Sequence, residues 1–95
     1  MIKSWANRPS ERLFLEGKAS GFRGLDVDSA LELLTILEAA TGLGDLSPLK
    51  SLGLHKLKGD RAGQWAMTVN ARWRICFRFK AGDAFDVEVV DYHRG

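Results

Sequence analysis

Seven residues of this chain carry side chains suited to moving protons and holding phosphate, and they come from three separate segments. They are His55, Lys58, Arg74, Arg78, Asp91, Tyr92 and His93. Histidine exchanges protons near neutral pH, and arginine and lysine stabilise extra negative charge on a phosphate. Together these residue types suit metal-free cleavage of RNA, in which the ribose 2′-hydroxyl attacks the adjacent phosphate.

In that reaction the 2′-hydroxyl loses a proton as it attacks, and the 5′-oxygen gains one as it leaves. We expect His93 to be the main acid or base and His55 to be a second proton or phosphate contact. Which histidine removes the proton and which donates it stays open. Asp91 can orient the imidazole of His93 or raise its pKa, and Tyr92 can stack on a base.

Lysine and arginine are the predicted phosphate contacts: Lys58, Arg74 and Arg78. Each site residue also has an alternative role without chemistry. His55 can be an ordinary, partly buried strand histidine, and His93 can belong to a frayed end. Asp91 can form an ion pair with Arg74 or Arg72, and Tyr92 can pack on the sheet.

Other chemistries lack the residues they need. The two histidines and the single cysteine, Cys76, are not at metal-ligand spacing, so we expect neither a zinc site nor an internal disulfide. There is no glycine-rich phosphate loop before a helix and no Ser/His/Asp order typical of acyl transfer. We therefore expect no cofactor, and we expect Cys76 to be a small packed side chain within a strand.

Length and composition indicate one domain over residues 1–95. The chain has 95 residues, 45% of them hydrophobic, which suffices for one core. No apolar run approaches the roughly 18 residues of a membrane span, and the first residues do not resemble a signal peptide. Together with the single cysteine, these features favour a reducing cytoplasm.

The net charge of +2 conceals a strong segregation of charge. Residues 50–82 hold eight basic residues against one acidic residue, a net +7, whereas residues 26–49 hold five acidic residues and no basic one. A basic block on a sheet suits a polyanion such as RNA. Ordinary solvated charge is the alternative interpretation.

The basic block coincides with alternating apolar and polar residues over 64–93, which predicts half-buried strands. Two antiparallel hairpins, with loops centred on Ala71 and Gly82, place the large apolar side chains on one face. The polar and charged side chains then lie on the other face, toward water. The predicted cross-strand pairs are Val69–Trp73, Met67–Ile75, Trp65–Phe77, Phe79–Phe85, Phe77–Val87 and Ile75–Val89, with Arg78 paired to Asp86.

The first half of the chain predicts an edge strand and two helices. Residues 1–5 suit the edge strand, and residues 10–17 suit a short helix with Ser10 as N-cap and Gly17 at its end. Residues 26–41 follow helical apolar spacing and supply a cover for the apolar sheet face.

The start of that longer helix offers several caps. Asp26 or Asp28 can cap it, and Ser29 with Glu32 can form a capping box. Residues 43–53 read as a loop and residues 54–58 as a further strand. The fold class is α+β, in the order β-α-α-β-β-β-β, with two N-terminal helices packed on one face of a mainly antiparallel sheet.

Three stretches of this chain stand out together: HKLKGDRAG at 55–63, WRICF at 73–77 and VDYH at 90–93. They resemble the HigB toxins of the RelE/ParE superfamily, the plasmid maintenance killer proteins. The start of the chain and of the longer helix is also similar, so the resemblance spans the whole chain. It implies the RelE-like fold, and it places His55, Asp91, Tyr92 and His93 in the family's active-site set, with Lys58 and Arg74 as cationic support.

The resemblance further implies a bacterial type II toxin, an endoribonuclease that cuts mRNA in the A site of the 70S ribosome and arrests translation. The implied partner is a HigA-like antitoxin with a helix-turn-helix, and no direct DNA binding is expected without it. Two alternatives stay open. One is a ParE-like member that poisons DNA gyrase without nuclease chemistry, and the other is a noncatalytic RNA-binding module.

Overall fold

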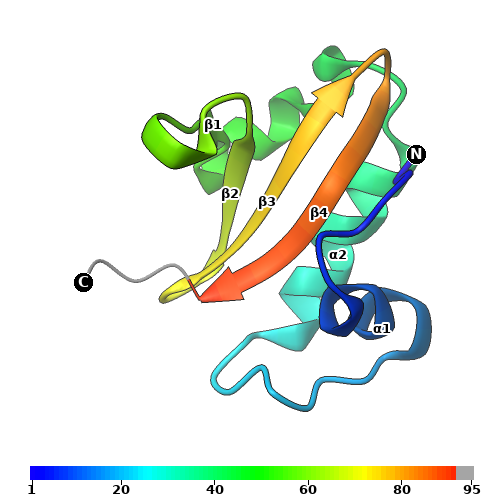
Figure 1. Cartoon of the computed structure of the whole chain (residues 1–95), viewed down its shortest axis with the longest axis vertical. Helices are drawn as coiled ribbons and strands as arrows, with labels where there is room; N and C mark the ends of the chain where they lie inside the picture. The colour runs from blue at the N-terminus through cyan, green and yellow to red at the C-terminus, as the bar shows by residue number, and fades with distance from the viewer. Residues whose placement is uncertain (92–95) are drawn as a thin grey trace.

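The computed structural model describes residues 1–91, apart from the side chains of residues 48, 51 and 52. Its elements are α1 (Arg8–Glu16), α2 (Val27–Ala39), η1 (Leu43–Leu52), β1 (His55–Lys56), η2 (Gly59–Arg61), β2 (Trp65–Asn70), β3 (Trp73–Lys80) and β4 (Asp83–Asp91). The strands form an antiparallel sheet in the order β1-β2-β3-β4, with α2 against one face (Figure 1). The predicted α+β class is confirmed. Within residues 1–91, no helix has the length and apolar character that a membrane span requires.

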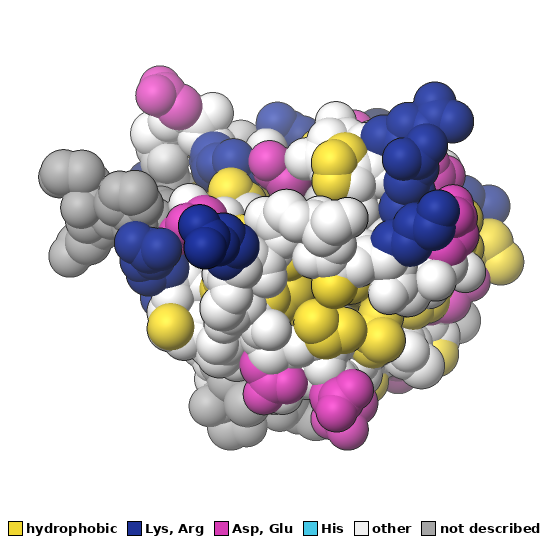
Figure 2. Space-filling view, turned by 90° about the horizontal axis from the view of Figure 1, so that it is seen from below, with side chains coloured by type: hydrophobic (Ala, Val, Ile, Leu, Met, Phe, Trp, Pro, Cys, Tyr) yellow, Lys and Arg dark blue, Asp and Glu magenta, His cyan; other side chains and the backbone are white. Residues whose placement is uncertain are grey.

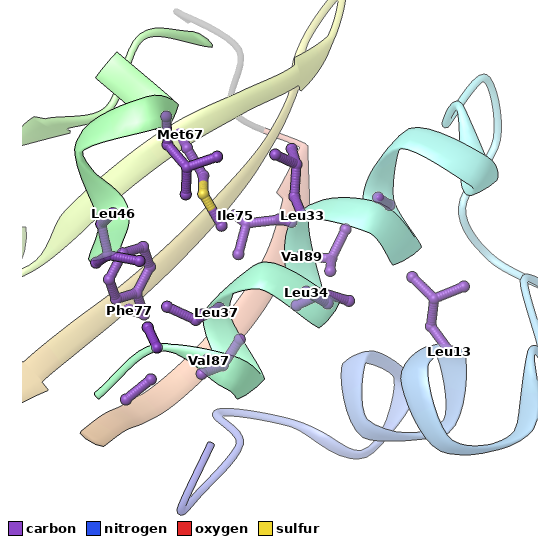
Figure 3. Packing of buried hydrophobic residues seen from close by; sticks show 14 of the residues in the cluster. Leu13, Leu33, Leu34, Leu37, Leu46, Met67, Ile75, Phe77, Val87 and Val89 are labelled. Atoms are coloured by element: carbon purple, nitrogen blue, oxygen red, sulfur yellow. The ribbon is translucent and has the colours of Figure 1, made fainter. Parts of the chain in front are cut away.

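The core lies between α2 and the inner face of the sheet (Figure 3). Helix α2 contributes Ala30, Leu33, Leu34 and Leu37, all buried. The sheet contributes Met67, Ile75, Phe77, Ala84, Val87 and Val89, and Leu13 of α1 closes one end. The predicted covering of the apolar sheet face by this helix is therefore confirmed.

The N-terminal segment runs along the free edge of β4. Ile2 bridges to Ala84 and Trp5 to Val87, both in parallel orientation, so the predicted edge strand exists as two isolated bridges. Ser10 continues this protection, because its buried hydroxyl accepts a hydrogen bond from the Val89 N–H at 2.9 Å. An otherwise unpaired strand edge is thereby covered.

The predicted cap of α1 was wrong. Asn7 is the N-cap and accepts from the Ser10 N–H at 3.0 Å, with Pro9 in the first turn. Ser10 lies inside the helix and its hydroxyl serves the sheet instead. Gly17 ends the helix in the left-handed region, at φ +69°, as predicted.

Helix α2 begins after Asp26, one of the two predicted caps. The Asp26 carboxylate accepts from the Ser29 N–H at 3.2 Å and from the Ser29 hydroxyl at 2.9 Å. Because Ser29 lies within the helix, the capping box that it would have begun was a wrong prediction. The helix ends at Ala39, two residues before the predicted end.

Residues 43–52, predicted as a loop, form the 3₁₀ helix η1. Leu46 and Leu49 are buried, because a spacing of three residues places both on one face of a 3₁₀ helix. Asp45 fixes the start: its carboxylate accepts from the N–H and the hydroxyl of Thr41, at 2.9 and 3.0 Å. The hydrogen bond from the Thr41 backbone is the largest cause that lowers the pKa of Asp45 below its ordinary value.

The β2–β3 hairpin keeps two of its three predicted pairs, Met67–Ile75 and Trp65–Phe77. The third was wrong, because a bulge between Thr68 and Asn70 places Asn70, not Val69, opposite Trp73. The Asn70 side chain explains the shift. It accepts from the Asp26 N–H and donates to the Gly24 carbonyl, both at 2.9 Å, and so joins the hairpin to the start of α2.

The β3–β4 hairpin keeps the predicted pair Ile75–Val89 but loses its register toward the turn. A bulge at Asp86, with φ +53°, shifts β4 by one residue. Phe85 then lies opposite Arg78, and the small Ala84 takes the predicted inward place opposite Phe79. A one-residue slip exchanges the two faces of a strand, so the predicted inward orientation of Phe85 was wrong.

Gly82 in the β3–β4 turn is a sensitive test of how this turn packs. It has φ +85°, and a Cβ atom there would overlap the carbonyl oxygen of Thr41. We expect Gly82→Ala to lower the free energy of unfolding by at least about 1 kcal/mol more than Gly21→Ala, measured by urea denaturation. Gly21 is the matched control, since it has φ +90° and open space around it. Equal losses would show that the contact with Thr41 is unimportant.

Ser10→Ala tests the bond between α1 and β4. Its removal leaves the Val89 N–H buried without its acceptor, so the free energy of unfolding should fall by about 1–3 kcal/mol. Ser20→Ala, at an exposed turn, should change it by less than about 0.5 kcal/mol. A loss as small as that of the control would contradict the structural role of the hydroxyl.

The lowered pKa of Asp45 predicts a pH dependence of stability. A carboxyl group with a depressed pKa in the folded state stabilises the fold above its ordinary pKa of 3.8, and this contribution disappears as the pH falls through the folded value. The wild type should therefore exceed Asp45→Asn in thermal stability at pH 7, by a margin that shrinks below about pH 4. Parallel stability curves from pH 7 to pH 2 would contradict this role.

Candidate active site

Those predicted site residues that fall within residues 1–91 lie on or beside the face of the sheet that points away from α2, which we call the outer face. Cross-strand partners share a face, so the pairing of His55 with Ala66, Ala66 with Cys76 and Cys76 with Glu88 defines one row across all four strands. The neighbouring row runs from Thr68 through Arg74 to Val90. His55 and Arg74 therefore share the outer face, on adjacent rows.

His55 is exposed at the edge strand, and its ring is held by the backbone. Its Nδ1 lies 2.6 Å from the carbonyl oxygen of Gly53. A carbonyl oxygen can only accept, so Nδ1 carries the proton and Nε2 is the nitrogen that can exchange a proton or contact a phosphate. The strand around it is shorter than predicted, covering two residues rather than five.

Arg74 points toward the β2–β3 turn. Its Nη1 donates to the carbonyl oxygens of Ala71 and Trp73, at 2.8 and 3.1 Å. These bonds fix the guanidinium at the end of the sheet where β4 finishes, and they use one of its three nitrogens. The residue is half-buried.

Asp91 is the last described residue and lies opposite Trp73 at the end of β4. Its Oδ1 is 3.3 Å from Nε of Arg72, so of the two ion-pair partners considered the structure has Arg72. Tyr92 and His93 lie outside the described residues. The structure therefore places the start of the Asp-Tyr-His run beside Arg72 and Arg74.

The other two predicted phosphate contacts, Lys58 and Arg78, differ in their surroundings. Lys58 is exposed and immediately precedes η2. Arg78 is paired with Asp86, with Nε 3.5 Å from Oδ2, as predicted. Arg78 lies beyond the row of His55, away from Arg74, so the structure does not bring it together with the end of β4.

The middle of the outer face is covered, contrary to the prediction of a cationic face open to water. Ala66 and Cys76 are both fully buried there, although they face away from the main core. Arg61 reaches across from η2, and its Nη2 is 3.2 Å from Oε1 of Glu88 on β4. The predicted packed role of Cys76 is confirmed, whereas Arg61 and Glu88 were missed as a pair because their approach depends on the fold.

Burial raises the pKa of the Cys76 thiol above its ordinary value. The charges of Arg61 and Arg74 act in the opposite direction, and that of Glu88 acts with burial. The thiol is therefore protonated and shielded at neutral pH. Residues 1–91 contain no group of three or more His, Cys, Asp or Glu side chains that could hold a metal ion.

Basic side chains are visible at the end of the molecule where the β2–β3 turn and the end of β4 lie. Figure 2, which views the molecule from this side, shows Lys and Arg side chains in separate groups, with Asp and Glu side chains and exposed hydrophobic side chains among them. The neighbouring loop is anchored to this end of the sheet, because Trp73 Nε1 donates to the Arg23 carbonyl at 2.9 Å and its ring meets Phe22 edge-on. This end of the sheet is a firm support for the side chains around Arg74.

Comparison with known proteins places this chain in a family. A family model described as the RelE-like toxin of type II toxin-antitoxin system HigB matches residues 3–93. The chain is also 43% identical over 93 residues to the Endoribonuclease HigB of Proteus vulgaris, covering 98% of this chain and 100% of that protein. The fold described above, with two helices before an antiparallel sheet, is consistent with this match. The chain therefore belongs to the HigB-like toxin family of type II toxin-antitoxin systems.

Proposed function

We propose that this toxin is a ribosome-dependent endoribonuclease that cleaves mRNA by metal-free acid-base catalysis and so inhibits translation. The relative from Proteus vulgaris that is 43% identical carries the name Endoribonuclease HigB, which supports a nuclease. The cations of Arg74 and Lys58 support a nucleic-acid substrate, because phosphates bind to such groups.

One observation carries the proposal: β4 delivers the beginning of the Asp91-Tyr92-His93 run to the end of the sheet that holds Arg74. His93 follows Asp91 by two residues, and we propose that its imidazole acts at this end of the sheet. A proton-exchanging group and a fixed guanidinium both serve the cleavage of an RNA phosphodiester.

In the proposed mechanism, one histidine takes the proton of the 2′-hydroxyl as that oxygen attacks the phosphorus, and the bond to the 5′-oxygen breaks. The departing 5′-oxygen receives a proton from an acid on the opposite side. His93 is the main acid or base, and His55 provides the second proton or phosphate contact through Nε2. Arg74 and Lys58 stabilise the added negative charge of the pentavalent phosphate, with Arg78 as a more distant phosphate contact.

Two further residues of the run support the reaction. Tyr92 stacks on a base of the mRNA, which holds the phosphate in line. Asp91 orients the imidazole of His93 while also pairing with Arg72. We place the reaction in the cytoplasm, on mRNA in the A site of the 70S ribosome, where the ribosome supplies the substrate geometry.

Membership of a toxin-antitoxin family gives this toxin an antitoxin partner. We propose that the partner is a HigA-like protein with a helix-turn-helix that neutralises the toxin and represses their operon, and that the toxin alone does not bind DNA.

His93→Ala and His55→Ala test the catalytic assignment. When induced in cells, the wild type should arrest growth and produce new mRNA 5′ ends in phase with codons. His93→Ala should lower cleavage by at least about 100-fold and spare the cells, since general acid-base groups contribute roughly 10²–10⁴-fold. His55→Ala should cause a smaller loss. The measurement is sequencing of mRNA ends after induction.

Lys18→Ala is the matched control, because this residue is exposed and lies on the segment after α1. Its cleavage pattern should equal that of the wild type at equal protein level. If His93→Ala were as toxic as the wild type, the catalytic assignment would be wrong. Double-strand DNA breaks without codon-phased mRNA ends would instead indicate gyrase poisoning.

A further inference from the structure

The connection between β1 and β2 does not stay beside the two strands that it joins, as a short hairpin connection would. Its base is closed by a hydrogen bond from the Leu57 N–H to the Gln64 carbonyl at 2.8 Å. From that base, Arg61 extends past β2 and β3 to contact Glu88 on β4. We call residues 57–64 the crossing segment.

Several contacts attach the crossing segment to the outer face of the sheet. Arg61 donates from Nη1 to Gln64 Oε1 at 3.0 Å and from Nη2 to Glu88 Oε1 at 3.2 Å. The side chains of Arg61 and Glu88 are 32% and 23% exposed, so solvent screens this pair less than a fully exposed one. Gly63 lies beside the end of the Arg78 side chain, since a Cβ atom there would be 2.7 Å from Nη1 of Arg78. We attribute the full burial of Cys76, the cross-strand partner of Glu88, to this cover.

Two glycines shape the crossing segment. Gly59 has φ +67° and Gly63 has φ +92°, values that glycine adopts at little cost. Gly59 begins the short η2, which has a hydrogen bond of its own from Ala62 N–H to the Gly59 carbonyl, and Gln64 N–H donates to the Arg61 carbonyl, both at 3.0 Å. The crossing segment is therefore a compact hydrogen-bonded turn, and Arg61 is its residue that pairs with β4.

Lys58 immediately precedes η2 in that turn, three residues before Arg61. We propose that Arg61 is a positioning residue of the nuclease site: by pairing with Glu88 it fixes η2 on the outer face and thereby fixes where Lys58 presents its ammonium group to the scissile phosphate. This inference rests on the proposed function. Arg61 also neutralises the carboxylate of Glu88, which lies in the same row as His55 and would otherwise repel a phosphate.

A double-mutant cycle separates positioning from general stability. Arg61→Ala should lower the rate of mRNA cleavage on programmed ribosomes by about 10- to 100-fold, because small misplacements of catalytic groups have effects of that size. In a Lys58→Ala background, the same change should lower the rate by less than about threefold, since the group that Arg61 positions is already gone. Equal losses in both backgrounds would overturn the proposal, because a structural role is independent of Lys58.

Cys76 reports on the crossing segment without any RNA. In the wild type its burial should make it react slowly with an aromatic disulfide reagent. Arg61→Ala and Glu88→Gln, which remove opposite ends of the same pair, should each raise the reaction rate at least about tenfold at pH 8. Unchanged Cys76 rates in both variants would also overturn the proposal.

Lys18→Ala is the control for both measurements, because it removes another ion pair, with Glu16 at 3.4 Å, away from the crossing segment. It should change neither the cleavage rate nor the Cys76 rate. If the wild type itself cuts no RNA, the proposed function and this inference both fall. If the wild type cuts RNA and the cycle is additive, only the positioning role of Arg61 is wrong.

Discussion

The burial of one sheet face beneath α2 is the constraint on which the rest of the structure depends. Leu34 and Leu37 pack against Ile75, Phe77 and Val87, all of them fully buried. Because side chains alternate along a strand, burying these residues forces their sequence neighbours to the opposite face. Arg74, Arg78 and Glu88 face outward for that reason, so the packing of the core decides which charged side chains the outer face carries.

The outer face then has to keep charged groups in fixed places without a core to hold them. The structure does this with backbone carbonyl groups and with carboxylates. Arg74 donates to two carbonyl oxygens of its own turn, and His55 to that of Gly53. Arg61 and Arg78 are held by Glu88 and Asp86. Side chains held in this way lose little further freedom on binding a substrate, which is the physical basis of preorganisation.

The two β-bulges show how local contacts modify the alternation. Asn70 occupies its place because its amide joins the start of α2 to the sheet, with one hydrogen bond accepted and one donated. Asp86 adopts a positive φ, and its N–H donates to the hydroxyl of Ser4 at 2.9 Å. Each bulge therefore attaches the sheet to a segment distant in sequence, and each one changes which side chains face outward near it.

The sequence by itself determined the fold class, the covering of the sheet by the second helix and the pairing at the centre of both hairpins, because periodicity and turn residues are local signals. It also contained the stretches that resemble the HigB toxins, from His55 to the Asp91-Tyr92-His93 run. Only the tertiary structure decided the position of the bulges, the cap of α1 and the crossing segment. Those features depend on contacts between residues far apart in the chain, such as Ser10 with Val89 and Arg61 with Glu88, which no local pattern encodes.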